Sequence, residues 1–475
     1  MNTESYEAVI GLEVHAELKT KSKIFCSCKT EFGGAPNTHC CPVCMGLPGA
    51  LPVLNERVVE LAALAGLALN CDISHICHHD RKNYFYPDLP KAYQISQKDT
   101  PLCRDGYLDI SLSGETRRIG IERIHIEEDA GKLIHSDAYG TMIDHNRCGV
   151  PLIEIVSKPH MRSAAEAKAY LEKLRETLLF SGVSDCKMNE GSMRCDINVS
   201  VRKKGDSRLY ARTEIKNLNS FAFAAKAIDY EIRRQIELTE NGGAVTQETR
   251  RYDEKSGKTL LMRAKENSED YRYFIEPDLP PFEISEVTLD MWRKKLPKSA
   301  DERRRELSEK YLLPKGDLDC ILSSPQSAEY FEKASGLTKH PKILANLIRC
   351  ELPVISGTSE FFCPLSAKSF AALCDLQGDG KINSSSAKIL LRKLYEKDTD
   401  PYSLAEAEGL LQIDGREALL PIVRKIVSEN PKAAEDYKKG KTAAARSLVG
   451  KVMGATGGRA NPTVAAELVE EELKK

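Results

Sequence analysis

Apolar and polar residues alternate along residues 7–18, close to the start of the chain. Side chains alternate between the two faces of a strand, so this pattern predicts a strand with one buried face and one polar face. The apolar positions are Ala8, Ile10, Leu12, Val14, Ala16 and Leu18. The opposite face carries Glu7, Glu13, His15 and Glu17, with Val9 and Gly11 between them.

Glu13 and His15 therefore point the same way from a rigid element, which suits a metal or proton-transfer site. The alternative interpretation is the solvated outer face of an antiparallel sheet. The pattern recurs, however, because several later segments also alternate and carry chemically capable residues on their polar sides. These residues are Arg194, Asp196, Glu214 and Lys216, and a further predicted strand at residues 151–156 carries Glu154 among apolar residues. Residues 118–132 form another predicted strand, with an acidic end at Glu127, Glu128 and Asp129.

Helical patterns are fewer in this part of the chain. Ser163 and Glu166 form a capping box that opens a predicted helix ending at Gly182. A second predicted helix begins near Ser220 and ends before Gly242. Strands joined by loops with few helices between them predict a largely antiparallel sheet with one functional face.

The composition changes near residue 295, after which the spacing of apolar residues is helical and no strand alternation remains. We therefore predict an α+β fold with a sheet domain at 1–294. An all-helical domain follows at 295–407, and a small helical tail domain occupies 408–475. A chain of 475 residues is too long for a single core, which agrees with about three domains.

The charge and cysteine content limit the classes of function. The formal net charge is −1, so a nucleic-acid surface would have to be local. No apolar run is long enough to span a bilayer, and the first residues lack the features of a signal peptide. Fifteen cysteines in a chain without an export signal are expected to be reduced thiols, which places the protein in the cytoplasm and off the membrane.

Four of the cysteines form two close pairs, Cys26 with Cys28 and Cys41 with Cys44, on either side of a glycine-rich loop. This spacing predicts a structural zinc knuckle at residues 26–44, because a small loop with little core needs such a crosslink. His39 and Cys40 are neighbours that could compete as ligands. The alternative is a set of buried free thiols.

A second candidate metal site consists of carboxylates and one imidazole. Its predicted ligands are Glu13, His15, Glu128 and Glu154. Oxygen-rich coordination favours magnesium or manganese, whereas the single imidazole fits manganese or zinc somewhat better. Spacing alone is equally compatible with surface carboxylates, but Glu154 is flanked by isoleucines, and a buried carboxylate needs a cation or hydrogen-bond donors.

Two segments have the composition of RNA-binding surfaces. Residues 80–97 interleave Lys82 and other basic residues with tyrosines, which suits a nucleotide or an RNA end; an ordinary proline-rich loop is the alternative. Residues 437–466 contain basic residues and no acidic one. Those proposed to contact RNA are Lys438, Lys439, Lys441, Arg446 and Lys451. A solvated helix face is the alternative for this segment.

The sequence resembles the GatB family, the B subunits of tRNA-dependent amidotransferases, from end to end. The matching blocks include IGLEVHAEL, DRKNYFYPDLPKAYQISQ, IHIEEDAGK, PLIEIVSKP, EGSMRCDINVSVR and VGKVMGATGGRANP. The resemblance implies a cradle-like sheet domain, a helical domain and a tail similar to the YqeY proteins.

The resemblance also implies an activity. Such proteins bind Glu-tRNA(Gln) or Asp-tRNA(Asn), activate the side-chain carboxylate with ATP as an acyl phosphate, and amidate it with ammonia. It implies magnesium at His15, Glu128 and Glu154 with Glu13 adjoining, and it places Lys82, Arg194, Asp196, Glu214 and Lys216 in matching motifs. The implied partners are mischarged tRNA and two further subunits of the amidotransferase, the A-type glutaminase and the small C-type subunit.

Two other classes of protein compete with this interpretation. A zinc-stabilised RNA-binding scaffold would need the knuckle and the basic tail but not Glu128 and Glu154. A metal-dependent hydrolase of aminoacyl-tRNA would act without ATP. The sequence does not indicate which of the two mischarged tRNAs is used.

Overall fold

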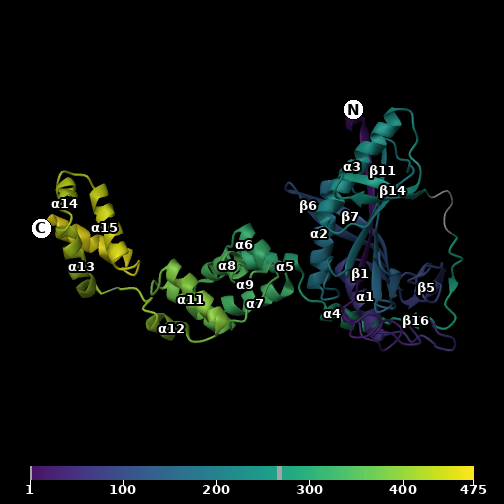
Figure 1. Cartoon of the computed structure of the whole chain (residues 1–475), viewed down its shortest axis with the longest axis horizontal. Helices are drawn as coiled ribbons and strands as arrows, with labels where there is room; N and C mark the ends of the chain where they lie inside the picture. The colour runs from purple at the N-terminus through teal and green to yellow at the C-terminus, as the bar shows by residue number, and fades with distance from the viewer. Residues whose placement is uncertain (1–2, 265–269, 359, 414) are drawn as a thin grey trace. The chain divides into compact units, whose positions relative to one another are not determined.

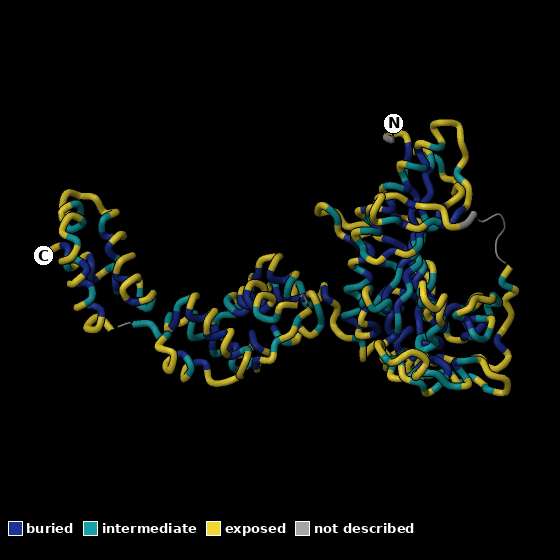
Figure 2. The backbone as a smooth tube through the Cα atoms, in the orientation of Figure 1, coloured by how far each residue is buried: buried dark blue, intermediate teal, exposed yellow. Residues whose placement is uncertain are grey.

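The computed structural model describes residues 3–264, 270–358, 360–413 and 415–475. The chain forms two compact units, Met1–Ala300 and Asp301–Lys475 (Figure 1). The first unit contains the strands and the second contains helices, so the predicted α+β class is confirmed. Figure 2 shows buried backbone concentrated along the sheet of the first unit.

The largest sheet of the described residues is antiparallel except between β12 and β13, which run parallel. In spatial order its strands are β14 (Lys258–Ala264), β13 (Glu248–Asp253), β12 (Thr213–Lys216), β11 (Met193–Lys203), β1 (Tyr6–Glu17), β10 (Pro151–Ser157), β7 (Glu115–Glu128), β6 (Cys103–Leu112) and β2 (Asp72–Ile73). The first strand of the chain thus lies in the middle of the sheet, as its alternating pattern allows.

Burial along β1 follows the predicted alternation. Ile10, Val14 and Ala16 are wholly buried, whereas Glu13 and His15 are half-buried on the other face. The buried face packs against three helices, α1 (Glu56–Ala68), α2 (Ala164–Phe180) and α3 (Phe221–Glu240), which together enclose the core. In Figure 1, α2 and α3 lie along one side of the sheet.

The caps predicted for two of these helices are present. The Ser163 side chain accepts a hydrogen bond from the Glu166 backbone N–H at the start of α2. Ser220 caps α3 in the same way. Gly182 adopts a positive φ of 74° just beyond α2, a conformation that glycine adopts without strain.

Smaller elements surround the large sheet. One three-stranded sheet joins β15 (Phe274–Ile275), β4 (Asp80–Asn83) and β5 (Tyr93–Ser96), and β5 lies beside the end of β7. The remaining elements of this unit are the 3-10 helix η1 (Thr3–Ser5), the strand pairs β16 (Phe282–Glu283) with β3 (Ile76–Cys77) and β8 (Lys132–Ser136) with β9 (Gly140–Asp144), and helix α4 (Glu286–Lys295).

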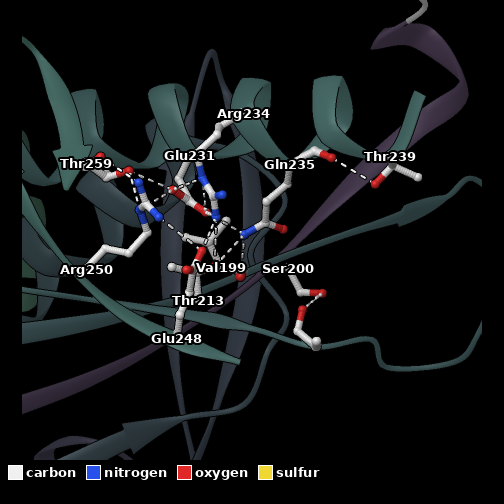
Figure 3. Close-up of polar contacts among 11 residues, drawn as sticks. Val199, Ser200, Thr213, Glu231, Arg234, Gln235, Thr239, Glu248, Arg250 and Thr259 are labelled. Carbon is white, nitrogen blue, oxygen red and sulfur yellow. Dashed lines mark hydrogen bonds and ion pairs between the residues drawn. The ribbon is translucent and has the colours of Figure 1, made fainter. Parts of the chain in front are cut away.

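A buried polar network ties α3 to the edge of the large sheet (Figure 3). The Glu231 carboxylate is wholly buried and accepts hydrogen bonds from Arg234, Gln235 and Thr259. Arg250 of β13 donates to the Thr259 hydroxyl at 2.9 Å, so the network also links the outer strands to each other. Because buried charges need such partners, these contacts fix how β13 and β14 sit beside β12.

The second unit is helical over its described residues. Its helices are α5 (Ala300–Tyr311), α6 (Lys315–Ile321), α7 (Pro325–Ser335), α8 (Pro341–Cys350), α9 (Leu352–Ser356), α10 (Ala367–Gly378), α11 (Ser384–Glu396), α12 (Pro401–Ala407), α13 (Arg416–Ser428), α14 (Pro431–Lys438), α15 (Ala443–Ala455) and α16 (Pro462–Lys474). The helices from α13 onward enclose an apolar core of their own, which includes Leu419, Leu448 and Leu468.

Among the described residues, each helix is either too short or too polar to cross a lipid bilayer.

Candidate active site

The candidate site lies on the polar face at the middle of the large sheet, where three neighbouring strands bring polar residues into register. His15 of β1 is paired with Glu154 of β10, and Glu154 is in turn paired with His125 of β7. Side chains of paired residues on one face lie close together, so this row needs no loop to assemble it. Glu127, two residues after His125, extends the same row.

The carboxylates of this row surround the histidines. Nε2 of His15 lies 3.3 Å from Oε2 of Glu154 and 3.4 Å from Oε1 of Glu127. Nε2 of His125 lies 3.6 Å from both carboxylates. One ligand atom each from His15, Glu127 and Glu154 falls within 4.8 Å of the others, so a single cation could contact all three.

Glu128 lies outside this group, although we expected it to be a metal ligand beside His15. Its carboxylate pairs with Lys91 and accepts a 2.9 Å hydrogen bond from the Ile95 backbone N–H. The reason is the alternation of β7: Ile124 and Ile126 face the core, and Glu128 shares their side while Glu127 faces the site. Glu127 therefore occupies the position that we had expected for Glu128.

The electrostatics of the row favour a bound cation. Burial alone would lower the pKa of His15, but the hydrogen bond and charge of Glu154 and the charge of Glu127 raise it to about 9. Burial would raise the pKa of Glu154, yet the charges of His125 and His15 hold it below its usual range. The pKa of Glu127 is lowered as well, so both carboxylates are charged near neutral pH, and a divalent cation could replace the proton of His15.

A second group of charges adjoins the first on β1, β11 and β12. Nζ of Lys216 lies 2.7 Å from Oδ2 of Asp196 and 3.2 Å from Oε1 of Glu214. Burial and the charges of Glu154, Glu214 and Asp196 raise the pKa of Glu13, which links the two groups electrostatically. Two carboxylates pair with Lys216, and Glu13 lies electrostatically close to both of them, so this group carries excess negative charge that attracts further cations.

Both groups face one open cavity of about 500 Å³. Predicted residues that line it are His15, Lys82, Glu154, Arg194, Asp196 and Lys216. Arg194 is oriented by Asp129, whose Oδ2 accepts from Nη2 of Arg194 at 2.5 Å. The structure thus brings together predicted residues from five strands that are separated by up to about two hundred positions in the chain.

An aromatic cavity of about 800 Å³ adjoins the first, because Lys82, Tyr84, Tyr86 and Lys216 line both. Nζ of Lys82 lies 4.9 Å from the ring centroid of Tyr271 and 5.7 Å from that of Tyr84. Phe85, at 87% exposed, extends the aromatic surface toward solvent. Stacking surfaces with a nearby cation are typical of sites for single-stranded nucleic acid.

The four predicted cysteines form a separate candidate metal site in the same unit. Sγ atoms of Cys26, Cys28, Cys41 and Cys44 all lie within 4.8 Å of one another. Cys40 lies outside this group, and its Sγ is 3.8 Å from Oδ1 of Asn146. Four converging sulfur atoms are the donor set of a closed, structural zinc site.

In the second unit, the predicted basic residues in α14, in α15 and between the two helices are all exposed. Two of the lysines pair with acidic residues that lie just before the segment 437–466 in the sequence. Nζ of Lys441 lies 3.0 Å from Oδ1 of Asp436, and Nζ of Lys439 lies 3.7 Å from Oε2 of Glu435. The positive charge of this surface is therefore smaller than the composition of the segment alone indicates.

Comparison with known families decides how these sites are to be interpreted. The model of the GatB/GatE catalytic domain matches residues 8–290, and that of the GatB domain matches residues 329–473. The chain belongs to the GatB/GatE family.

Relatives of this GatB/GatE-family chain align with nearly its whole length. The B subunit of the aspartyl/glutamyl-tRNA(Asn/Gln) amidotransferase from Caldicellulosiruptor saccharolyticus is 50% identical over 477 residues, with 99% of each chain covered. The protein of the same name from Caldanaerobacter subterraneus subsp. tengcongensis is 51% identical over 473 residues, which cover 99% of this chain and all of that one. The family resemblance that the sequence motifs indicated is confirmed.

Two residues of the GatB/GatE catalytic domain, His125 and Glu127, were missed as site residues by sequence reasoning. The signal was present, because the isoleucines at 119, 121, 124 and 126 define the buried side of β7 toward its end. A β-bulge, seen as a register shift between Val156 and Ser157 opposite this strand, interrupts simple counting from its start. Because Ile126 is buried, its two neighbours in the strand, His125 and Glu127, fall on the polar face.

Proposed function

We propose that the protein is the B subunit of a tRNA-dependent amidotransferase that converts Glu-tRNA(Gln), Asp-tRNA(Asn) or both into the amidated forms. The observation that carries this proposal is the cavity in which a carboxylate–histidine group and a Lys216-centred group of carboxylates face each other. The names of the relatives, which cover the whole chain, support it.

The chemistry begins with a poor electrophile. An oxygen of the substrate side-chain carboxylate attacks the γ-phosphorus of ATP, ADP leaves, and an acyl phosphate forms. Ammonia then attacks the acyl carbon, phosphate leaves, and a proton is released as the amide forms. Both steps gather negative charge on phosphoryl oxygens, so the site must supply positive charge in fixed positions.

The residues of the first row fit a divalent cation. His15, Glu127 and Glu154 would hold Mg²⁺, because they offer two carboxylates and one imidazole that converge from adjacent strands. Bound there, Mg²⁺ would supply charge compensation for the phosphates. His125 contacts both carboxylates and would keep them oriented.

The second group would act on the nucleotide. Lys216 carries an ammonium whose pKa is raised by Asp196 and Glu214 against the effect of burial, so it remains a cation in contact with phosphate. Lys82 lines the same cavity, and Arg194 is held by Asp129. We propose that Lys82, Arg194 and Lys216 contact phosphates, and that Glu13, Asp196 and Glu214 set the position of Lys216 and of bound cations.

The RNA end would enter through the aromatic cavity. Tyr84, Phe85 and Tyr86 offer faces on which the terminal bases can stack, and the ester-linked amino acid would then reach the adjoining cavity. The exposed lysines at the end of α14 and just after it, with Arg446 and Lys451 of α15, would contact the phosphate backbone of the tRNA body.

The remaining parts of the proposal concern partners and cofactors. Ammonia would come from the A-type glutaminase of a heterotrimer that also contains the small C-type subunit. The four-cysteine site would hold structural Zn²⁺, since a closed set of four sulfur ligands leaves no position for substrate. The reaction would take place in the cytoplasm, where aminoacyl-tRNA is made and used.

One assay tests the function. The reconstituted complex is given each mischarged tRNA, with and without ATP, and amide, free amino acid and ADP are measured. We expect amide only with ATP, together with one ADP for each amide formed. Release of the free amino acid without ATP would indicate a hydrolase. Tight tRNA binding without any conversion would indicate a non-catalytic scaffold.

A further inference from the structure

Lys23 is wholly buried beside Cys44 of the four-cysteine site. Its Nζ donates a 2.7 Å hydrogen bond to the backbone carbonyl of His39 and lies 3.7 Å from Sγ of Cys44. Among the described residues, no carboxylate lies within 4 Å of this ammonium. Among the described side chains, the one whose polar atom contacts this ammonium is that of Cys44.

A buried ammonium without a counter-charge is very unfavourable, because its loss of hydration is not repaid by a neutral hydrogen-bond acceptor. One carbonyl group satisfies one of the three protons of Lys23 but does not neutralise the charge. The Cys44 sulfur is the side-chain atom that Nζ of Lys23 contacts, so the geometry places the lysine against the donor set of the four-cysteine site.

Backbone contacts show that this placement belongs to the knuckle itself. The Lys23 backbone N–H donates to the carbonyl of Cys28 at 3.0 Å, which attaches the lysine to the turn that carries the first cysteine pair. The next residue, Ile24, donates to the carbonyl of Gly149 at 2.9 Å and joins the turn to the rest of the domain. The Lys23 side chain then reaches the second cysteine pair at Cys44.

A second lysine in the same small cavity shows the usual arrangement. Lys91 lines the cavity together with Lys23 and Cys44, and it forms an ion pair with the buried carboxylate of Glu128. Lys23 lacks such a carboxylate partner among the described residues. The two lysines therefore have separate counter-charges, a carboxylate for Lys91 and sulfur for Lys23.

We propose that Lys23 is the built-in counter-ion of a zinc tetrathiolate formed by Cys26, Cys28, Cys41 and Cys44, an inference that rests on the zinc centre proposed above. Four thiolates and one Zn²⁺ carry two net negative charges. The ammonium of Lys23 cancels one of them inside the domain and donates toward the Cys44 sulfur. It is a positioning residue that raises the affinity for zinc and does not coordinate the metal.

The test compares Lys23→Met with a matched control, Lys29→Met, in the full-length chain. Lys29 lies next to Cys28 in sequence but is exposed and pairs with Glu31, so its replacement changes the net charge equally without altering the buried face. Zinc content is measured by elemental analysis, and zinc affinity by competition with a chromophoric chelator. We expect Lys23→Met to weaken zinc binding about 10-fold or more, and Lys29→Met to leave it within about twofold.

A second background guards against simple misfolding of Lys23→Met. Cys44→His replaces one thiolate by a neutral imidazole and lowers the net charge of the centre to one negative charge. In that background Lys23→Met should cost clearly less zinc affinity than in the wild type, because the counter-ion has less charge to neutralise. A purely structural role of Lys23 predicts the same loss in both backgrounds, and that result would overturn the inference.

The remaining outcomes are also distinct. Wild-type protein that binds no zinc overturns the proposed zinc centre and this inference together. Wild-type protein that binds one zinc, with affinity unchanged in Lys23→Met, overturns only the role of Lys23.

Discussion

The hydroxyl of Thr249 donates a 2.8 Å hydrogen bond to Oε2 of Glu214 across the parallel pair β12–β13. Thr249 is almost fully buried, and its partner shares Lys216 with Asp196 on the wall of the active-site cavity. The hydroxyl fixes one oxygen of Glu214 and leaves the other to Lys216. Thr249 thus orients a charged group of the site from the lining of the adjoining aromatic cavity, which it shares with Lys216.

This relationship predicts that Thr249→Val lowers kcat for amidation by about 10-fold, since a hydrogen bond to a charged group contributes about 1.5–3 kcal/mol. Thr249→Ser, which keeps the hydroxyl, should restore kcat. Thr239→Val is a matched control, because the Thr239 hydroxyl bonds the Gln235 carbonyl of its own helix. Steady-state kinetics and melting temperatures are compared, and equal kcat for Thr249→Val and wild type would contradict the prediction.

Glu127 and Glu128 are neighbours on β7 but face opposite sides, so their substitutions should have different effects on activity and metal binding. Glu127→Gln and Glu154→Gln should each lower amidation 100-fold or more while tRNA binding is retained, because each removes a charge from a phosphoryl-transfer centre. Both should also weaken Mn²⁺ binding, measured by electron paramagnetic resonance. Glu128→Gln should retain Mn²⁺ affinity, because its carboxylate faces Lys91 instead. If Glu128→Gln loses Mn²⁺ and Glu127→Gln does not, the proposed ligand set is wrong.

The tail lysines predict a graded dependence of tRNA binding on salt. Lys438→Ala should weaken binding more than Lys441→Ala, because Lys441 already pairs with Asp436 whereas no ion pair is formed by Lys438 within the described residues. Replacing Lys438, Lys439 and Lys441 together should lower the slope of log K against log salt by at most the amount expected for about three phosphate contacts.

Deletion beyond residue 410 should raise KM for mischarged tRNA and leave the partner's glutaminase activity unchanged. Unchanged affinity in the truncated protein would exclude the tail as the tRNA-binding surface.

His79 predicts a pH dependence of stability. Its ring is wholly buried, and neither ring nitrogen has a hydrogen-bond partner among the described residues. Burial lowers the pKa of His79 to about 4 from a usual 6.5. The unfolded chain therefore binds a proton that the folded chain excludes, and stability falls by about 3 kcal/mol as the pH drops from about 6.5 to about 4.

His79→Leu should remove this part of the pH dependence, whereas His135→Leu, in the exposed strand β8, should not. Urea unfolding of each full-length variant at several pH values measures the difference. A wild-type curve that is parallel to the His79→Leu curve across this range would show that His79 does not contribute.

The alternation of apolar and polar residues determined much of this protein. It predicted β1 and its two faces, and local capping signals at Ser163 and Ser220 predicted the starts of α2 and α3. It also placed Asp196 and Lys216 on polar faces, whereas Glu154 was singled out as a carboxylate within an apolar strand. These features depend on contacts within a few residues, which a linear pattern records directly. The predicted boundary between the helical domain and the tail stays a prediction.

The tertiary structure alone decided which of these residues meet. Strand order and register bring His15 together with Glu154 and His125, which lie more than a hundred residues later in the chain. The parallel pairing of β12 with β13 brings Thr249 to Glu214, and the fold of the knuckle buries Lys23 against Cys44. Register, strand order and burial depend on packing across the whole domain, so the sequence supplied the reactive groups and the sheet determined their partners.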